Sequence, residues 1–141
     1  MRSWALPLGG ALVALGIGAL AACEAPDPSV VSGRVVLAPG VRSTLGESDA
    51  LFVVARSGDG KPGPPVAVVK HLGARLPMSY RIGQEDVLEP GRFFREPVRI
   101  RVIVRRSGFV GVPGPEDMEG EATGTVQPGT EGVDVVLRPL R

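Results

Sequence analysis

Residues 98–105 read "VRIRVIVR", and this stretch decides the fold class of the chain. Apolar and basic side chains alternate along it. Successive side chains of a β-strand point to opposite faces, so this pattern predicts a strand with one face in a core and the other in water. The core-facing positions are Ile100, Val102 and Val104, and the solvent-facing positions are Arg99, Arg101 and Arg105.

Other short β-like runs lie on both sides of this strand. The chain has 20 Gly and 14 Pro among 141 residues, which interrupts it too often for long helices. Only 43–49 and 85–88 allow a single helical turn, and the run "ALFVVAR" at 50–56 is apolar enough to be buried on both faces. About seven short strands predict an all-β fold, a β-sandwich. The predicted strands are 31–37, 50–56, 66–72, 78–82, 98–105, a weaker 121–126, and 132–137.

The first 22 residues have the features of an exported protein's signal peptide. Arg2 and the free amine give a positive start, and residues 4–22 carry no charge. The end of this segment, "LAAC" at 20–23, fits the bacterial lipobox, and Cys23 is the only cysteine. We therefore expect Cys23 to be lipidated. The alternative is an uncleaved signal anchor in which Cys23 has no role.

These features predict three segments. Residues 1–22 are the lipoprotein signal peptide, 23–29 are the lipidated cysteine and an extended tether, and 30–141 are the β-sandwich domain. Two or more acyl chains hold a protein stably on a bilayer. We expect a location in the cell envelope that faces the periplasm, and Glu24 after the cysteine slightly favours the outer membrane.

The charge balance excludes one class of partner. Without Arg2, the chain has 15 Lys and Arg residues against 15 Asp and Glu residues. A general nucleic-acid binder carries a basic excess, so no nucleic-acid partner is expected.

Few residues have the types or spacing that chemistry requires. His71 is the only histidine, so a nucleophile–histidine pair would have to use it, and it lies in a predicted strand. The stretch "GDGKPG" at 58–63 lacks the Ser or Thr of a phosphate-binding loop. The soft copper ligands Met78 and Met118 are far from each other and from His71. The sequence predicts neither an enzyme nor a bound cofactor or metal.

The arginines of 98–105 have two interpretations. Arg99, Arg101 and Arg105 are candidate partner-binding residues, on a basic face that holds an acidic protein, a heme propionate or lipid headgroups. The favoured alternative is that acidic residues of 116–121 pair with them across strands on a solvated face.

Several short motifs occur in one order: "SGRVVLAPG", "DALFVVARS", "GPPVAVVKHLGARLPMSYRI", "LEPG" and "DMEGEATGTVQPGTEGVDVVL". Their order and spacing resemble the C-terminal periplasmic domain of the cytochrome c-type biogenesis protein CycH, also called CcmI. The resemblance implies an immunoglobulin-like β-sandwich and a link to cytochrome c maturation. In that family the full-length protein helps to present apocytochrome c to the heme ligation machinery. It carries membrane-spanning helices and a tetratricopeptide region before this domain, where the present sequence has the lipobox and tether.

Three functions follow as expectations. The first is a lipid-anchored, non-catalytic protein-interaction module that assists cytochrome c maturation or respiratory-complex assembly, with a maturation component or apocytochrome c as its partner. The second is a metal- or heme-handling periplasmic lipoprotein. The third is a structural envelope lipoprotein unrelated to cytochromes.

Overall fold

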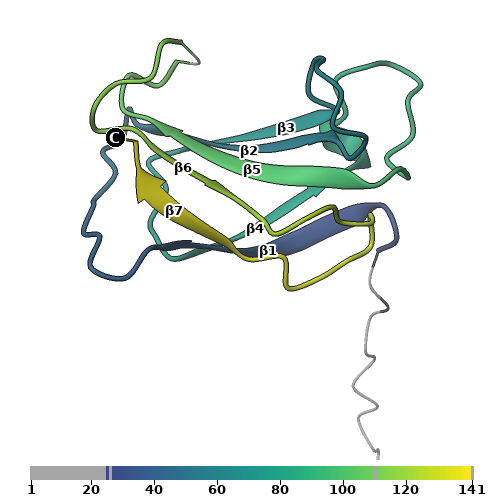
Figure 1. The fold of residues 1–141 in the computed structure, drawn as a ribbon, viewed down its shortest axis with the longest axis horizontal. Coiled ribbons are helices and arrows are strands. Elements are labelled where there is room, and N and C mark those ends of the chain that lie inside the picture. Colours follow the sequence, from purple (N-terminus) through teal and green to yellow (C-terminus); the bar gives the residue numbers. More distant parts are fainter. Residues whose placement is uncertain (1–24, 26, 110, 141) are drawn as a thin grey trace, which may run out of the picture.

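The computed structural model of the protein describes residues 25, 27–109 and 111–140 (Figure 1). The expected signal peptide and the expected lipidation site, Cys23, lie outside the described residues. The described chain consists of seven strands and one short 3-10 helix, and none of its helices is long and apolar enough to cross a membrane. The strands are β1 Val30–Leu37, β2 Ala50–Ser57, β3 Ala67–Leu72, β4 Met78–Gly83, β5 Val98–Arg105, β6 Met118–Glu121 and β7 Val135–Pro139, and the helix η1 is Gln84–Asp86.

The strands form one hydrogen-bonded sheet that folds back on itself. Their order is β3-β2-β5-β6-β7-β1-β4, and every neighbouring pair is antiparallel except β1 and β7. Figure 1 shows two layers, with β3, β2 and β5 in one and β7, β1 and β4 in the other. Strand β6 connects the layers and shares only two residue pairs with β7, where the sheet turns. The predicted all-β sandwich is confirmed.

The core lies between the two layers, and β5 contributes its centre. Ile100, Val102 and Val104 are fully buried in this core, as their alternation predicts. The opposite side of β5 differs from the prediction at one residue, because Arg105 is only 5% exposed instead of lying in water. Two carboxylates cover it, that of Asp117 at the end of the β5–β6 loop and that of Glu119 on the neighbouring strand β6, as described below.

The predicted bounds of two strands were wrong. Strand β6 spans Met118–Glu121, so it shares only residue 121 with the predicted 121–126. Gly124 adopts a positive φ of 69°, and the chain leaves the sheet before it. Val126 then returns to form an isolated bridge with Val98. Strand β7 begins at Val135, three residues after the predicted start, since Gly132 also has a positive φ, of 71°. Such backbone conformations suit glycine and end regular strands.

The strand directions place the loops at two opposite ends. Strand β1 begins where the N-terminal segment enters the domain, and β7 runs parallel to it. Strand β5 runs in the same direction, because both β5 and β7 are antiparallel to β6. The β5–β6 loop of residues 106–117 therefore lies at the far end from Val30, as Figure 1 shows. An eight-residue strand separates the two ends by about 26 Å.

Candidate protein-binding face

The outer face is the side of β3, β2, β5 and β6 that points away from the core, and its centre is apolar. Ala50, Phe52 and Val54 of β2 are all buried there, in a cluster separate from the main core. Val68 of β3 and Ile103 of β5 pack against them. The prediction that β2 is buried on both faces is thus confirmed. Outward positions of a two-layer sandwich are usually polar, so this centre is an exception. The remaining residues of the outer face are Arg56, Lys70, Leu72, Arg99, Arg101, Arg105, Asp117, Glu119 and Glu121.

The β3 side of the outer face combines exposed apolar surface with free positive charge. Leu72 lies opposite Ala50 and is 61% exposed. The Lys70 Nζ lies 5.7 Å from the centre of the Phe52 ring, a distance at which a cation and an aromatic face attract. Among the described residues, Lys70 forms no ion pair.

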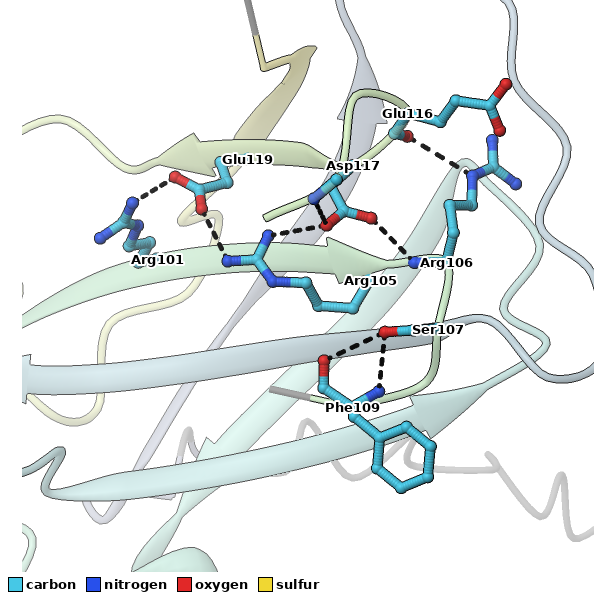
Figure 2. Close-up of polar contacts among 9 residues, drawn as sticks. Arg101, Arg105, Arg106, Ser107, Phe109, Glu116, Asp117 and Glu119 are labelled. Atoms are coloured by element: carbon cyan, nitrogen blue, oxygen red, sulfur yellow. Dashed lines mark hydrogen bonds and ion pairs between the residues drawn. The ribbon is translucent and has the colours of Figure 1, made fainter. Parts of the chain in front are cut away.

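The β6 side of the outer face is an ion-pair ladder between β5 and β6 (Figure 2). Glu119 accepts hydrogen bonds from the guanidinium groups of Arg101 and Arg105, the latter at 3.0 Å. Arg105 also lies 3.7 Å from Asp117. The pairing of these arginines with carboxylates across strands is therefore present in the structure.

The third sequence-predicted arginine, Arg99, pairs more loosely than the other two. Its guanidinium is 4.0 Å from Glu121, and both side chains are half-exposed. All three candidate arginines lie on the outer face. Two of them, Arg101 and Arg105, are held in the ion-pair ladder.

The ladder continues into the base of the 106–117 loop. The Asp117 carboxylate accepts hydrogen bonds from the main-chain N–H groups of Arg106, at 2.9 Å, and Gly114, at 2.7 Å. The Arg106 guanidinium donates to the Asp49 carboxylate and to the Thr44 carbonyl, both at 2.7 Å. Both ends of the loop are thus fixed to each other and to the neighbouring 38–49 loop.

The buried carboxylates of this region stay ionised. Burial by itself raises the pKa of Asp117, but the hydrogen bonds from Arg106 and Gly114 and the nearby arginine charges outweigh it and hold the pKa below its ordinary value. Burial likewise opposes a low pKa at Glu119, and the hydrogen bonds from Arg101 and Arg105 overcome it. Both groups therefore carry their charge at neutral pH.

These lowered pKa values predict that acid destabilises the domain. A carboxyl group whose pKa is lower in the folded chain stabilises it fully above its unfolded pKa, near 4, and this contribution is lost as pH falls through the folded value. We expect the free energy of unfolding to be nearly constant from about pH 7 to 5 and to fall below about pH 4. Urea unfolding followed by far-ultraviolet circular dichroism at each pH measures it. The Asp117→Asn/Glu119→Gln double variant is the control and should depend less on pH; equal slopes for both proteins would contradict the assignment.

The 106–117 loop presents apolar side chains to solvent at the far end of the domain. Phe109 is 76% exposed and Val112 is 96% exposed. In Figure 2, Phe109 and Glu119 lie on opposite sides of β5. Single exposed apolar residues are common on protein surfaces. Here two of them lie on one loop whose base is held in place, so together they offer a partner an apolar contact surface.

The sequence did not reveal the exposure of this loop tip or the position of Lys70 over Phe52. One property of the outer face could nevertheless be read from the sequence, namely that β2 is apolar on both of its sides. Six consecutive residues, "ALFVVA" at 50–55, are all buried in the structure, which a two-layer sandwich does not require of a strand.

The histidine and methionines considered as metal ligands lie on three different strands. His71 is half-buried on β3, Met78 packs against the core from β4, and Met118 is inside the core on β6. Within the described part of the chain, no three His, Cys, Asp or Glu side chains gather in a group that could hold a metal ion.

The two layers, the Greek-key-like strand order and the single enclosed core define an immunoglobulin-like β-sandwich domain. A family model described as the cytochrome c-type biogenesis protein H Ig-like domain matches residues 31–137, and the chain belongs to this family. The resemblance found in the sequence is thereby confirmed. A search of the curated proteins found no match, and a search of the solved structures found none either.

Two glycines of the matching motifs have a steric reason to be glycine. A Cβ atom on Gly33 would lie 2.0 Å from the Val133 carbonyl oxygen, and one on Gly120 would lie 2.2 Å from the Val136 carbonyl oxygen. Glycine in a strand often marks a place where another backbone approaches closely. Both glycines lie where the chain of the 132–137 region passes over β1 or β6.

Proposed function

We propose that the protein is a lipid-anchored, non-catalytic interaction module that assists cytochrome c maturation or respiratory-complex assembly by binding a partner protein. The family supports the link to cytochrome c biogenesis. The observation that carries the interaction role is the exposed apolar side chains at the far end of the domain, Leu72 on β3 and Phe109 and Val112 on the 106–117 loop. Exposed apolar side chains that gather at one end of a domain mark an interaction site more often than single scattered ones do.

The charged side chains support a non-catalytic role. The carboxylates of the outer face bind arginines and main-chain N–H groups of the same chain. Their pKa values lie below the ordinary range, whereas a general acid or base works best with a pKa near the operating pH. Their arrangement serves to hold strands and a loop in place.

The proposed anchor is a lipid on Cys23, which keeps the domain near a membrane on the periplasmic side. The tether from Cys23 to Ser29 has seven residues, so its fully extended length is about 25 Å. The domain begins at Val30. A short tether at this end turns the 106–117 loop toward the side away from the membrane, where a partner has access.

Replacement of Cys23 by serine tests the anchor and the function together. We expect the variant to lose its acyl chains and to fall about tenfold or more in the membrane fraction, because these chains supply the membrane affinity. Pull-down of the wild-type protein from solubilised membranes of its host should recover cytochrome c maturation components or apocytochrome c, and the variant should not. Mass spectrometry identifies the recovered proteins.

A Ser29→Ala variant, changed in the tether but not in the lipobox, is the matched control and should behave as wild type. A Cys23→Ser protein that stays in the membrane pellet at the wild-type level would support the uncleaved anchor instead. Recovery of unrelated envelope proteins alone would refute the link to cytochromes.

A further inference from the structure

Strand β3 is an edge of the sheet, and its main chain is paired on one side only. Among the described strands, β2 is its only neighbour. In such an antiparallel pair, residues whose main-chain groups bond the partner strand alternate with residues whose groups point away. The Gly73 N–H donates to the Asp49 carbonyl at 3.0 Å, which fixes this alternation. Odd-numbered residues of β3 therefore direct their main-chain groups toward β2, and even-numbered residues direct theirs outward.

The chain itself covers the beginning of this outward side and then leaves it. Val87 forms an isolated antiparallel bridge with Ala67, and the Leu88 N–H donates to the Val66 carbonyl at 3.0 Å. These are the contacts that an added strand makes with a sheet edge. A strand partner is thus already accommodated at the start of β3, for the length of one bridge.

The free edge of β3 is the outward side of residues 68–72, beyond this bridge. The main-chain groups of Lys70 and Leu72 point outward there and have no hydrogen-bond partner within the described part of the chain. Both residues are exposed. The free edge is about 13 Å long at the rise of a β-strand. A row of unpaired N–H and C=O groups of this kind is a template for another strand.

The Lys70 side chain leaves the free edge open. Lysines on edge strands often prevent pairing with another chain. Here the Lys70 Nζ lies 5.7 Å from the centre of the Phe52 ring, and Phe52 is directly opposite on β2. The side chain therefore extends over the neighbouring strand and away from the unpaired main-chain groups.

The charge of Lys70 disfavours a second copy of this chain as the occupant. Antiparallel pairing of two free edges in full register places Lys70 opposite Lys70, and like charges directly opposite destabilise a strand pair. A different protein avoids this repulsion. The neighbouring side chains on the same face are Val68, which is half-buried, and Leu72, which is 61% exposed. Apolar residues opposite them would add favourable cross-strand contacts.

We propose that an extended segment of a partner protein pairs with the free edge of β3 as an additional strand, with apolar side chains beside Val68 and Leu72. Main-chain hydrogen bonds supply the affinity in this mode of binding, and alternate side chains supply the specificity. The inference rests on the proposed function and names how the partner binds. Leu72 belongs both to the free edge and to the exposed apolar end of the domain.

Proline at position 70 tests the proposal, because it lacks the N–H group that the added strand would bind. This N–H points away from β2, so the substitution keeps the ladder with β2, and proline is tolerated at such edge positions. Lys70→Ala is the matched control, since it removes the same charge and keeps the N–H.

A second control makes the same change at the opposite edge of the sheet. Ser79 of β4 lies opposite Arg34, whose main-chain N–H donates to the Asp134 carboxylate instead of to β4. The Ser79 N–H therefore also points outward, and Ser79→Pro removes it without disturbing the pairing with β1.

Photo-crosslinking of the full chain in membranes of its host measures the binding. A benzophenone amino acid replaces the exposed Leu72, and each of the three substitutions is added to this protein. Every variant must show the wild-type circular dichroism spectrum, and mass spectrometry maps the crosslinked segment. We expect Lys70→Pro to lower the yield about tenfold, because a carbonyl of the partner loses its donor. Lys70→Ala and Ser79→Pro should keep the wild-type yield.

Hydrogen exchange gives a second measurement that needs no proline variant. A synthetic peptide with the sequence of the crosslinked segment is added to the detergent-solubilised full chain, and nuclear magnetic resonance follows single amides. Without peptide, the amides of Lys70 and Leu72 should exchange faster than those of Val69 and His71, which bind β2. With peptide, the amides of Lys70 and Leu72 should slow about tenfold or more.

Equal yields for Lys70→Pro and Lys70→Ala would overturn the proposal, and so would a Lys70 amide that the peptide does not protect. A crosslink to lipid or to a second copy, or no crosslink at position 72, would also overturn it. If the proline variant does not fold, hydrogen exchange decides. The proposed function fails separately: a protected edge with a strand from an unrelated envelope protein refutes the link to cytochromes alone. Recovery of maturation proteins with unprotected amides refutes the edge pairing alone.

Discussion

Alanine at position 33 is expected to destabilise the domain by about 3 kcal/mol, the upper end of the usual cost of overpacking, because its methyl group has no room. Gly33 lies opposite Tyr80 in the β1–β4 pair. The Val133 main chain crosses directly over it and is held there from two sides. The Tyr80 hydroxyl donates to the Val133 carbonyl at 2.6 Å, and the Val133 N–H donates to the Ser32 carbonyl at 2.9 Å. A Cβ atom 2.0 Å from that carbonyl oxygen would force the two segments apart and lengthen both bonds.

Urea unfolding of the detergent-solubilised protein, followed by circular dichroism, measures the change as a lower midpoint with a similar slope. Gly63→Ala is the matched control, since no atom lies within 4 Å of its added Cβ. We expect the control to unfold within about 0.5 kcal/mol of the wild type. Equal midpoints for the Gly33 and Gly63 variants would show that the strands are not held as tightly as the structure indicates.

Asp117→Ala is expected to lower the free energy of unfolding by about 3–5 kcal/mol, the usual cost of removing one partner of a buried ion pair. The change deprives the N–H groups of Arg106 and Gly114 of their acceptor. It also removes one of the two carboxylates that cover Arg105, whose side chain is almost fully buried. A buried guanidinium group with one fewer acidic partner must be hydrated or change its position, and either change costs free energy.

Glu121→Ala provides the comparison, because its pair with Arg99 is half-exposed and long. Such surface pairs contribute about 0–1 kcal/mol, so this variant should unfold close to the wild type. Hydrogen exchange separates the two effects further. The amides of the 106–117 loop should exchange faster in Asp117→Ala and at the wild-type rate in Glu121→Ala. Equal losses of stability in both variants would contradict a structural role for the buried pair.

The three outward-facing arginines of β5 have equivalent places in the alternating sequence, but they have different roles in the structure. Arg101 and Arg105 hold β5 to β6 and support the base of the 106–117 loop. Arg99 is half-exposed with a distant partner, so its guanidinium needs little rearrangement to contact another molecule. The prediction that all three bind a partner stays a prediction, and substitution of Arg99 would test it with the least effect on stability.

The sequence by itself determined the fold class, the strand that forms the core and the family. It did so because side chains alternate along a strand, and this alternation is written in neighbouring residues. The run "VRIRVIVR" therefore placed Ile100, Val102 and Val104 in the core, and "ALFVVA" indicated a strand buried on both faces. The ordered motifs were enough to indicate the family that the comparison then confirmed.

Only the tertiary structure decided which distant residues meet. The contact between Gly33 and Val133 joins positions far apart in the chain, and the parallel pairing of β1 with β7 brings them together. The burial of Arg105 depends in the same way on where Asp117 and Glu119 lie after the 106–117 loop turns the chain back. The boundaries of β6 and β7 were missed for a related reason. Whether a glycine takes a positive φ and ends a strand depends on the partner strand available to it, which local composition does not specify.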